Sequence, residues 1–124
     1  MKHTIHRRKA LALSVAGALA IGLSLSAQAA DYPAKPINFV VPFGAGSATD
    51  LLARAIGQSV SLESKQTVIV DNKAGASGMI AAQHVAKAAA DGYTVLITTN
   101  TTQSANEHLY KKLPYDPVKD FTPV

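Results

Sequence analysis

Three short segments of the chain are continuously apolar and rich in β-branched residues. Runs of this length and composition are typical of strands that are buried on both faces of a sheet. Loops of small or polar residues follow each of them, and the turn-forming pair Asp91-Gly92 precedes the third run. The predicted strands are Ile37–Pro42, Thr67–Val70 and Tyr93–Thr98.

Between these segments, apolar residues recur at intervals of three and four, which is the spacing of one helical face. The spacing predicts helices over 48–62 and 79–90, and a short third helix over 105–110. The residues expected to face the sheet are Leu51, Leu52, Ala55, Ile56 and Val60 in the first helix, and Ile80, Ala81, Val85 and Ala88 in the second.

Alternation of continuous apolar strands with helices predicts parallel strand pairing, with helices on both faces of the sheet. Right-handed crossovers then give a doubly wound, mostly parallel α/β fold. In such a fold, the loops that follow the strands all emerge at the carboxyl edge, which is where open α/β sheets bind ligands. The three loops that follow the strands are therefore the candidate ligand-binding segments.

The first 29 residues have the pattern of a secretory signal peptide. Four basic residues precede an uncharged apolar stretch at 10–25, and the small-x-small motif Ala27-Gln28-Ala29 predicts cleavage after Ala29. A transmembrane helix is the alternative, but it would need about 20 apolar residues. We expect export to the periplasm, with the adjacent Arg7 and Arg8 leaving the general secretory and twin-arginine routes both open.

Charge and cysteine content exclude several functions. Without the four basic residues of the leader, eight Lys and Arg balance eight Asp and Glu, so the mature chain has no basic excess for nucleic acid. The chain has no cysteine, which excludes disulfides, thiolate metal sites, a Cys nucleophile and a lipid-modified cysteine after the leader. We expect a soluble periplasmic protein.

The loop after the first strand combines glycines with a helix-capping motif. Residues 47–50 (Ser-Ala-Thr-Asp) have the form of a capping box, with Ser47 as N-cap and Asp50 as its N3 partner. Gly44 and Gly46 would let a ligand approach the backbone closely. Because the first N–H groups of a helix have no partner and lie at its positive end, this loop predicts an anion site.

The side chains of this loop have a simpler interpretation. Ser47 and Asp50 are expected to cap the helix, and Arg54 to pair with Asp50 at i,i+4 spacing rather than to bind a ligand. The predicted site therefore depends on backbone donors.

Two further loops repeat or complement this arrangement. The loop 73–78 (KAGASG) again offers small residues and backbone donors before a helix, and 98–104 (TTNTTQS) offers hydroxyl and amide groups. A simple glycine connection and a solvated turn, respectively, remain as alternatives.

Other site chemistries do not fit the motifs. Thr49 stands where a dinucleotide-binding loop has its third glycine, and no Lys-Ser or Lys-Thr pair closes a P-loop. Ser47 directly follows Gly46, whereas a hydrolase elbow is G-x-S-x-G. His84 and His108 fall on helices and are expected to be solvated, and no metal-ligand spacing occurs.

Three stretches of the chain resemble the substrate-binding receptors of tripartite tricarboxylate transporters, the Bug-type periplasmic receptors. They are YPAKPINFVVPFGAGSATDLLAR (32–54), VIVDNKAGASGMIAAQHVAKAAADGYTVLITT (68–99) and NEHLYKKLPYDPVKDFTPV (106–124), within which PYDPVKDF is the most specific run. The resemblance implies a periplasmic-binding-protein type II fold, in which two α/β lobes close on a carboxylate held by backbone donors and ordered water.

By this resemblance, residues 30–124 are a partial N-terminal lobe, and the second lobe is missing from the chain. Three departures from the family pattern occur: Ser47 replaces a usual glycine, Ala74 a frequent proline and Gln103 a frequent histidine. The residues predicted to bind the ligand, with Phe43 as an apolar wall, are Phe43, Gly44, Ala45, Gly46, Ser47, Thr49, Asp50, Gly75, Ala76, Ser77, Gly78, Thr99 and Thr101.

The sequence thus predicts a periplasmic receptor that captures a small carboxylate, a di- or tricarboxylate, another organic acid or an amino acid, and presents it to membrane permease subunits. No catalytic residue, metal or cofactor is expected. A truncated, non-functional receptor fragment is one alternative. A secreted α/β hydrolase that uses Ser47 is the other.

Overall fold

The computed structural model describes residues 31–124. The predicted signal peptide and its cleavage after Ala29 lie outside the described residues. No helix within residues 31–124 is long and apolar enough to cross a membrane.

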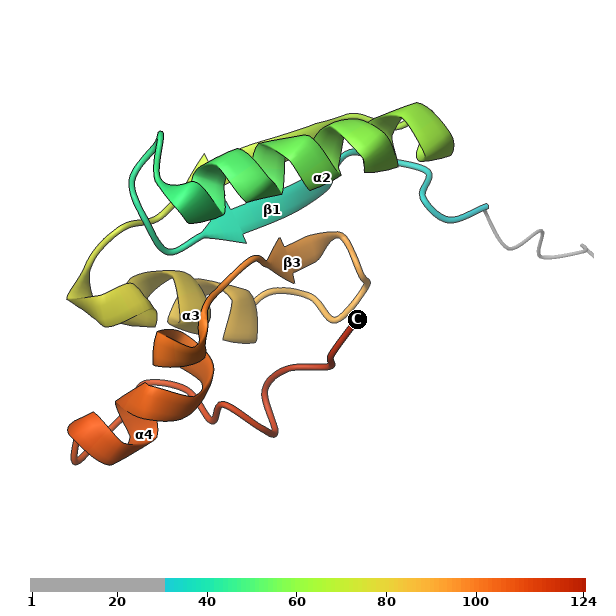
Figure 1. The fold of residues 1–124 in the computed structure, drawn as a ribbon. Helices are drawn as coiled ribbons and strands as arrows, with labels where there is room; N and C mark the ends of the chain where they lie inside the picture. Colours follow the sequence, from blue (N-terminus) through green and yellow to red (C-terminus); the bar gives the residue numbers. More distant parts are fainter. Residues whose placement is uncertain (1–30) are drawn as a thin grey trace, which may run out of the picture. The chain divides into compact units, whose positions relative to one another are not determined.

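The described residues are organised around a three-stranded parallel sheet (Figure 1). Its strands are β1 (Ile37–Val41), β2 (Val68–Asn72) and β3 (Thr94–Leu96), in the order β2-β1-β3. Phe39 of β1 is in register with Val70 on one side and Val95 on the other. The central strand is the most deeply buried, as its continuous apolar run predicts.

Two helices cover the opposite faces of this sheet (Figure 1). Helix α2 (Ala48–Ser64) connects β1 to β2, and α3 (Met79–Ala86) lies on the path from β2 back to β3. Because the two crossovers run in opposite directions across the sheet, right-handed connections place their helices on different sides. The predicted doubly wound α/β fold is confirmed.

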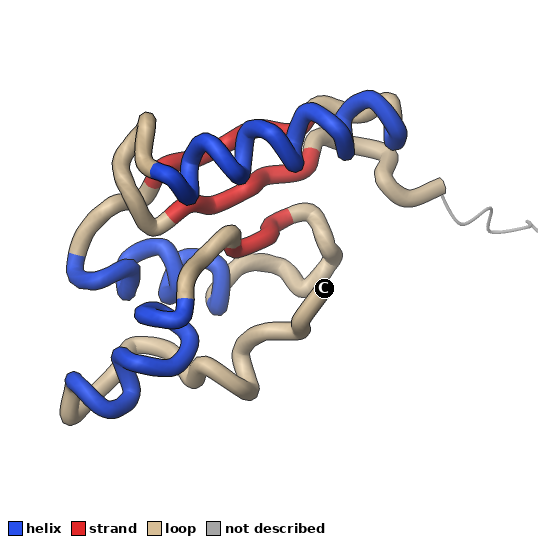
Figure 2. Tube along the Cα trace, in the orientation of Figure 1, coloured by secondary structure: helices blue, strands red, loops and turns tan. Residues whose placement is uncertain are grey.

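Shorter helical turns complete the described segment (Figure 2). Residues Ala76–Gly78 form a 3₁₀ turn before α3, and a π-helical turn at Thr101–Ala105 leads into α4 (Asn106–Leu109). The prediction of an irregular polar loop through 104 was therefore wrong after residue 100, where the chain is already helical. The remaining residues follow α4 without further helix or strand.

The inward face of α2 differs from the prediction. Its buried residues are Asp50, Ala53 and Gly57, while Leu51 and Leu52 are exposed. Small residues face the sheet because the helix packs close to it: a Cβ on Gly57 would lie 3.0 Å from Val68 Cγ1. Counting large apolar residues therefore selected the wrong side of this helix. Ala55 and Ile56 are likewise exposed, and only Val60 of the predicted face packs on the core.

Small residues also form the inward face of helix α3. Ala81 and Ala82 are fully buried, whereas Ile80, which was predicted to face inward, is half exposed. The helix also ends at Ala86, before the predicted end at 90, with Lys87 as its C-cap. The core is thus built mainly from β1, with alanines and glycine from the helices rather than with large helical side chains.

Candidate functional site

The first loop begins α2 in the way its motif predicts. Ser47 is the N-cap, and its Oγ accepts a hydrogen bond from the Asp50 N–H at 3.2 Å. The reciprocal bond differs from a standard capping box, because Asp50 Oδ2 accepts from the N–H of Gly46 at 2.8 Å rather than from Ser47. The Ser47 N–H instead donates to the Gly44 carbonyl at 3.2 Å. The capping motif therefore folds the whole glycine loop back onto the helix start.

Asp50 is the centre of a buried polar network rather than a ligand contact. Its side chain is 2 % exposed, and besides Gly46 it accepts from Arg54 Nε at 3.0 Å and from Asn72 Nδ2 at 2.9 Å. The bond from Arg54, followed by those from Gly46 and Asn72, lowers the pKa of Asp50 to about 2. The prediction that Asp50 contacts the ligand is therefore corrected. All hydrogen-bond partners of its side chain belong to the chain itself, and solvent barely reaches the carboxylate.

Fewer backbone N–H groups of the first loop are available to a ligand than predicted. The N–H groups of Gly46, Ser47 and Asp50 are used within the loop. Among residues 31–124, no hydrogen-bond partner occurs for the N–H groups of Gly44, Ala45, Ala48 and Thr49. Ala48 and Thr49 begin the 17-residue helix α2, where the peptide dipoles favour an anion.

The second loop has an unusual backbone. Four successive residues have positive φ: Gly75 (129°), Ala76 (48°), Ser77 (53°) and Gly78 (83°). The Gly78 N–H donates to the Gly75 carbonyl at 3.0 Å, so this amide is also removed from the predicted donor set. Within the described part of the chain, the N–H groups of Gly75, Ala76 and Ser77 have no hydrogen-bond partner.

The three loops contact one another at the carboxyl edge of the sheet. A Cβ on Gly78 would lie 3.1 Å from Pro42 Cβ of the first loop and would clash with Thr102 Oγ1 after β3. Asn72, at the end of β2, donates through Nδ2 to the Phe43 carbonyl at 3.0 Å. The expectation that the loops meet at one edge is confirmed. Phe43 itself is partly buried and packs against the core cluster, which fixes the position of its ring.

The turn after β3 contributes buried hydroxyl and amide groups. Thr99 Oγ1 and Thr102 Oγ1 are buried and have no hydrogen-bond partner within the described residues, and the same holds for Gln103 Oε1. Thr101 is half buried. Buried polar atoms are normally paired, so an unpaired group beside two amide-rich loops is a position where a ligand or water could bind.

Sequence reasoning missed three residues that organise the site. Asn72 joins the first loop to β2, Asn106 donates to the Ser77 carbonyl at 3.0 Å, and Tyr115 donates to the Thr102 carbonyl at 2.6 Å. Asn72 and Asn106 are fixed by hydrogen bonds to residues far away in the sequence, and no local pattern reveals such contacts. The signal that could have identified Tyr115 is its place inside the specific run PYDPVKDF.

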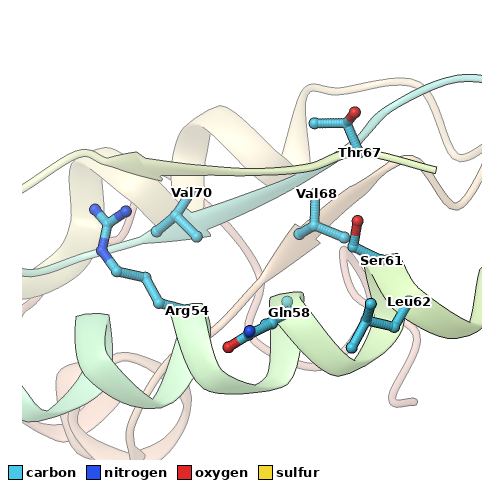
Figure 3. A pocket seen from close by; sticks show the side chains of 8 residues that line it. Arg54, Gln58, Ser61, Leu62, Thr67, Val68 and Val70 are labelled. Carbon is cyan, nitrogen blue, oxygen red and sulfur yellow. The ribbon is translucent and has the colours of Figure 1, made fainter. Parts of the chain in front are cut away.

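Two hollows of the described surface lie away from these loops. A groove of about 360 Å³ runs between α2 and the outer edge of β2, with Arg54, Gln58 and Ser61 on the helix side and Thr67, Val68 and Val70 on the strand side (Figure 3). A larger hollow of about 910 Å³ lies beside β3 and residues 117–124. Neither is lined by the predicted ligand residues.

Comparison with known proteins decides the family. The model of the tripartite tricarboxylate transporter family receptor matches residues 52–124, which is more than half of the chain. The chain belongs to this receptor family.

Relatives and solved structures agree with this assignment. A UPF0065 protein of Bordetella bronchiseptica is 46 % identical over 99 residues, which cover 80 % of this chain and 30 % of the relative. An R. palustris protein solved with adipate is 46 % identical, with a TM-score of 0.73 over 76 % of this chain and 31 % of that one. MatC from Rhodopseudomonas palustris, solved with malate, is 41 % identical, with a TM-score of 0.72 over 75 % and 32 % of the two chains.

The periplasmic binding protein BugD is 41 % identical, with a TM-score of 0.67 over 74 % of this chain and 30 % of BugD. The chain therefore spans about 30 % of the length of the relatives that it matches. These neighbours confirm the α/β fold as that of periplasmic binding proteins. The family is one of receptors rather than enzymes, and Ser47 Oγ, whose hydrogen bond comes from a backbone amide, has no feature of an activated nucleophile.

Proposed function

We propose that this chain is part of an exported periplasmic receptor that binds a small carboxylate and delivers it to the membrane subunits of a tripartite transporter. The observation that carries the proposal is the meeting of two amide-rich loops at one sheet edge, joined through Pro42, Gly78 and Thr102. Family membership supports the receptor role, and the neighbours solved with adipate and malate support a dicarboxylate as the ligand class.

The proposed contacts are backbone N–H groups rather than charged side chains. The first loop offers Gly44, Ala45, Ala48 and Thr49, and the second offers residues 75–77. A carboxylate that accepts charge-assisted hydrogen bonds from these amides gains about 1.5–3 kcal/mol from each. In the whole receptor, a second lobe would close over this surface and exclude water.

The site makes no charge pair of its own with the ligand in this proposal. Arg54, the nearest cation along the chain to the first loop, is occupied: its Nε contacts Asp50 and its guanidinium also donates to Asn72 Oδ1 at 3.3 Å. Backbone donors recognise any carboxylate, so selection among organic acids would come from the length of the ligand and from the second lobe.

A thermal-shift screen of dicarboxylates, tricarboxylates and amino acids, with adipate and malate among them, tests the proposal. Ligand at roughly a hundredfold excess over its Kd stabilises the folded state by about 2.7 kcal/mol. Hexanediol, which has the length of adipate without its charges, is the control and should give no shift. No response to any dicarboxylate, tricarboxylate or amino acid, or an equal response to the diol, would refute the carboxylate site.

A single substitution can remove one proposed donor. Ala48 is the first residue of α2, where proline is tolerated, and the preceding Ser47 already has the extended φ of −67° and ψ of 160° that a residue before proline requires. Ala48→Pro should therefore leave the fold intact and weaken adipate binding by about 1.5–3 kcal/mol. Ala48→Gly, which keeps the N–H, is the matched control and should retain binding.

A further inference from the structure

The run PYDPVKDF at 114–121 has no role in the carboxylate contacts proposed above. It folds as a turn held by its own carboxylates: Asp116 Oδ1 accepts from the N–H groups of Val118 at 3.0 Å and Lys119 at 2.9 Å, and Asp120 Oδ2 accepts from the Asp116 N–H at 2.7 Å. Residues 114–121 therefore form a turn that is fixed by its own hydrogen bonds, and this turn is called the platform below.

Tyr115 projects from this platform into the lobe. Its side chain is 6 % exposed, and its ring packs edge-on against Phe121 with the centroids 5.9 Å apart. Its hydroxyl donates to the Thr102 carbonyl at 2.6 Å and accepts from Asn106 Nδ2 at 3.2 Å. One buried phenol thus connects the platform to the turn after β3 and to the start of α4.

Asn106 extends this connection to the second loop. Its side chain is fully buried, and Nδ2 donates both to the Tyr115 hydroxyl and to the Ser77 carbonyl, the latter at 3.0 Å. The N–H of the same Ser77–Gly78 peptide donates to the Gly75 carbonyl at 3.0 Å. This peptide group is therefore held at both ends.

The Ser77–Gly78 peptide lies in a stretch of the second loop with an unfavourable backbone conformation. Ala76 and Ser77 have φ of 48° and 53°, a left-handed conformation that residues with a side chain keep only when their surroundings enforce it. The side chain of Ser77 contributes an exposed contact, Oγ to Tyr110 Oη at 3.0 Å. The contact to its carbonyl, from Asn106, is partly buried.

We propose that Asn106 and Tyr115 are positioning residues that hold the second loop in its left-handed conformation, with the N–H groups of Ala76 and Ser77 free for a ligand. The PYDPVKDF run then acts on the site from a distance, through the Tyr115–Asn106–Ser77 chain of hydrogen bonds. The effect on the ligand rests on the proposed carboxylate function, while the effect on the loop does not.

Amide hydrogen exchange of the full chain without ligand tests the effect on the loop. In Asn106→Ala, the Gly78 N–H should exchange about fivefold to tenfold faster, because the loss of one buried hydrogen bond corresponds to that factor. Tyr115→Phe, which keeps the shape of the ring, should increase the rate about two- to fivefold. The Lys73 and Ile97 amides, which donate to Val41 and Val40 across the sheet, report on the rest of the lobe and should not change.

Tyr110→Phe is the matched control, because it removes a tyrosine hydroxyl that contacts the side chain of Ser77 instead of supporting its carbonyl. It should leave Gly78 exchange at the wild-type rate. Calorimetric titration with adipate should then show about fivefold weaker binding for Tyr115→Phe and unchanged binding for Tyr110→Phe.

The outcomes separate the two proposals. Unchanged Gly78 exchange in Asn106→Ala and Tyr115→Phe would overturn the positioning role, and so would equally faster exchange at Lys73 and Ile97, which indicates general loosening. Unchanged adipate affinity in variants with faster Gly78 exchange would also overturn it. If the wild-type chain binds none of the dicarboxylates, tricarboxylates and amino acids of the thermal-shift screen, the carboxylate function fails, and Gly78 exchange still decides the positioning role.

Discussion

Gly78 offers the sharpest test of how the three loops meet. Its φ of 83° is left-handed, which costs alanine about 1–2 kcal/mol. A Cβ at this position would also lie 3.1 Å from Pro42 Cβ and clash with Thr102 Oγ1, and overpacking of this kind costs about 1–3 kcal/mol. Gly78→Ala should therefore lower the free energy of unfolding by about 2–5 kcal/mol.

Two other glycines separate these contributions. Gly46 has a φ of 82° but no atom within 4 Å of a built Cβ, so Gly46→Ala should cost only the backbone term of about 1–2 kcal/mol. Gly44 has neither a positive φ nor a close neighbour, and Gly44→Ala should change stability by at most about 0.5 kcal/mol.

Urea unfolding of the full chain measures the series. Because Gly78→Ala can abolish folding, the double variant Gly78→Ala/Thr102→Ala is part of the test. It removes the Thr102 hydroxyl from the contact and should recover about 1 kcal/mol or more. Equal losses for Gly78→Ala and Gly46→Ala, or no recovery in the double variant, would refute the close contact between the loops.

The remaining predictions concern Asp50 and the inward face of α2. The pKa of Asp50 is lowered from 3.8 to about 2, so its stabilising effect is present above about pH 4 and is lost as pH falls through 2. Asp50→Asn should therefore have a lower melting temperature than wild type at neutral pH, and this difference should shrink as the pH falls toward 2. A difference that stays constant down to pH 2 would contradict the hydrogen-bond network around Asp50. On α2, Leu52→Ser should change the unfolding free energy by no more than about 0.5 kcal/mol, since the side chain is 56 % exposed. Ala53→Leu should cost about 1–3 kcal/mol, and the reverse ranking in urea unfolding would contradict the helix orientation.

The parallel strand pairing and the meeting of the loops could be predicted because they follow from general rules. Continuous β-branched runs indicate buried parallel strands, and the loops that follow parallel strands share the carboxyl edge. Right-handed crossovers place the connecting helices on the two faces of the sheet. The N-cap at Ser47 and the Asp50–Arg54 pair were also predictable, since both depend on residues within one helical turn.

The inward faces of the helices could not be predicted from apolar spacing alone. At Ala53 and Gly57 the helix approaches the sheet so closely that small residues are required, and the large apolar side chains point elsewhere. Spacing identifies a face but does not reveal how near the sheet lies. The exposed Leu51 and Leu52 led the prediction to the wrong side.

The donor set of the site was only partly predictable. A capping motif indicates that amides lie at the helix start, but not which of them the chain uses itself, and Gly46 and Gly78 proved to be occupied. The supporting residues Asn72 and Asn106 act across separations of 22 to 29 residues, where no local pattern links partner to partner.

An NMR titration of the isotope-labelled chain with adipate tests the central claim most directly, because it reports on each amide separately. The N–H signals of Ala45, Thr49, Ala76 and Ser77 should shift with adipate and should not shift with hexanediol. Shifts that are equal for both compounds, or that are confined to the groove between α2 and β2, would contradict it.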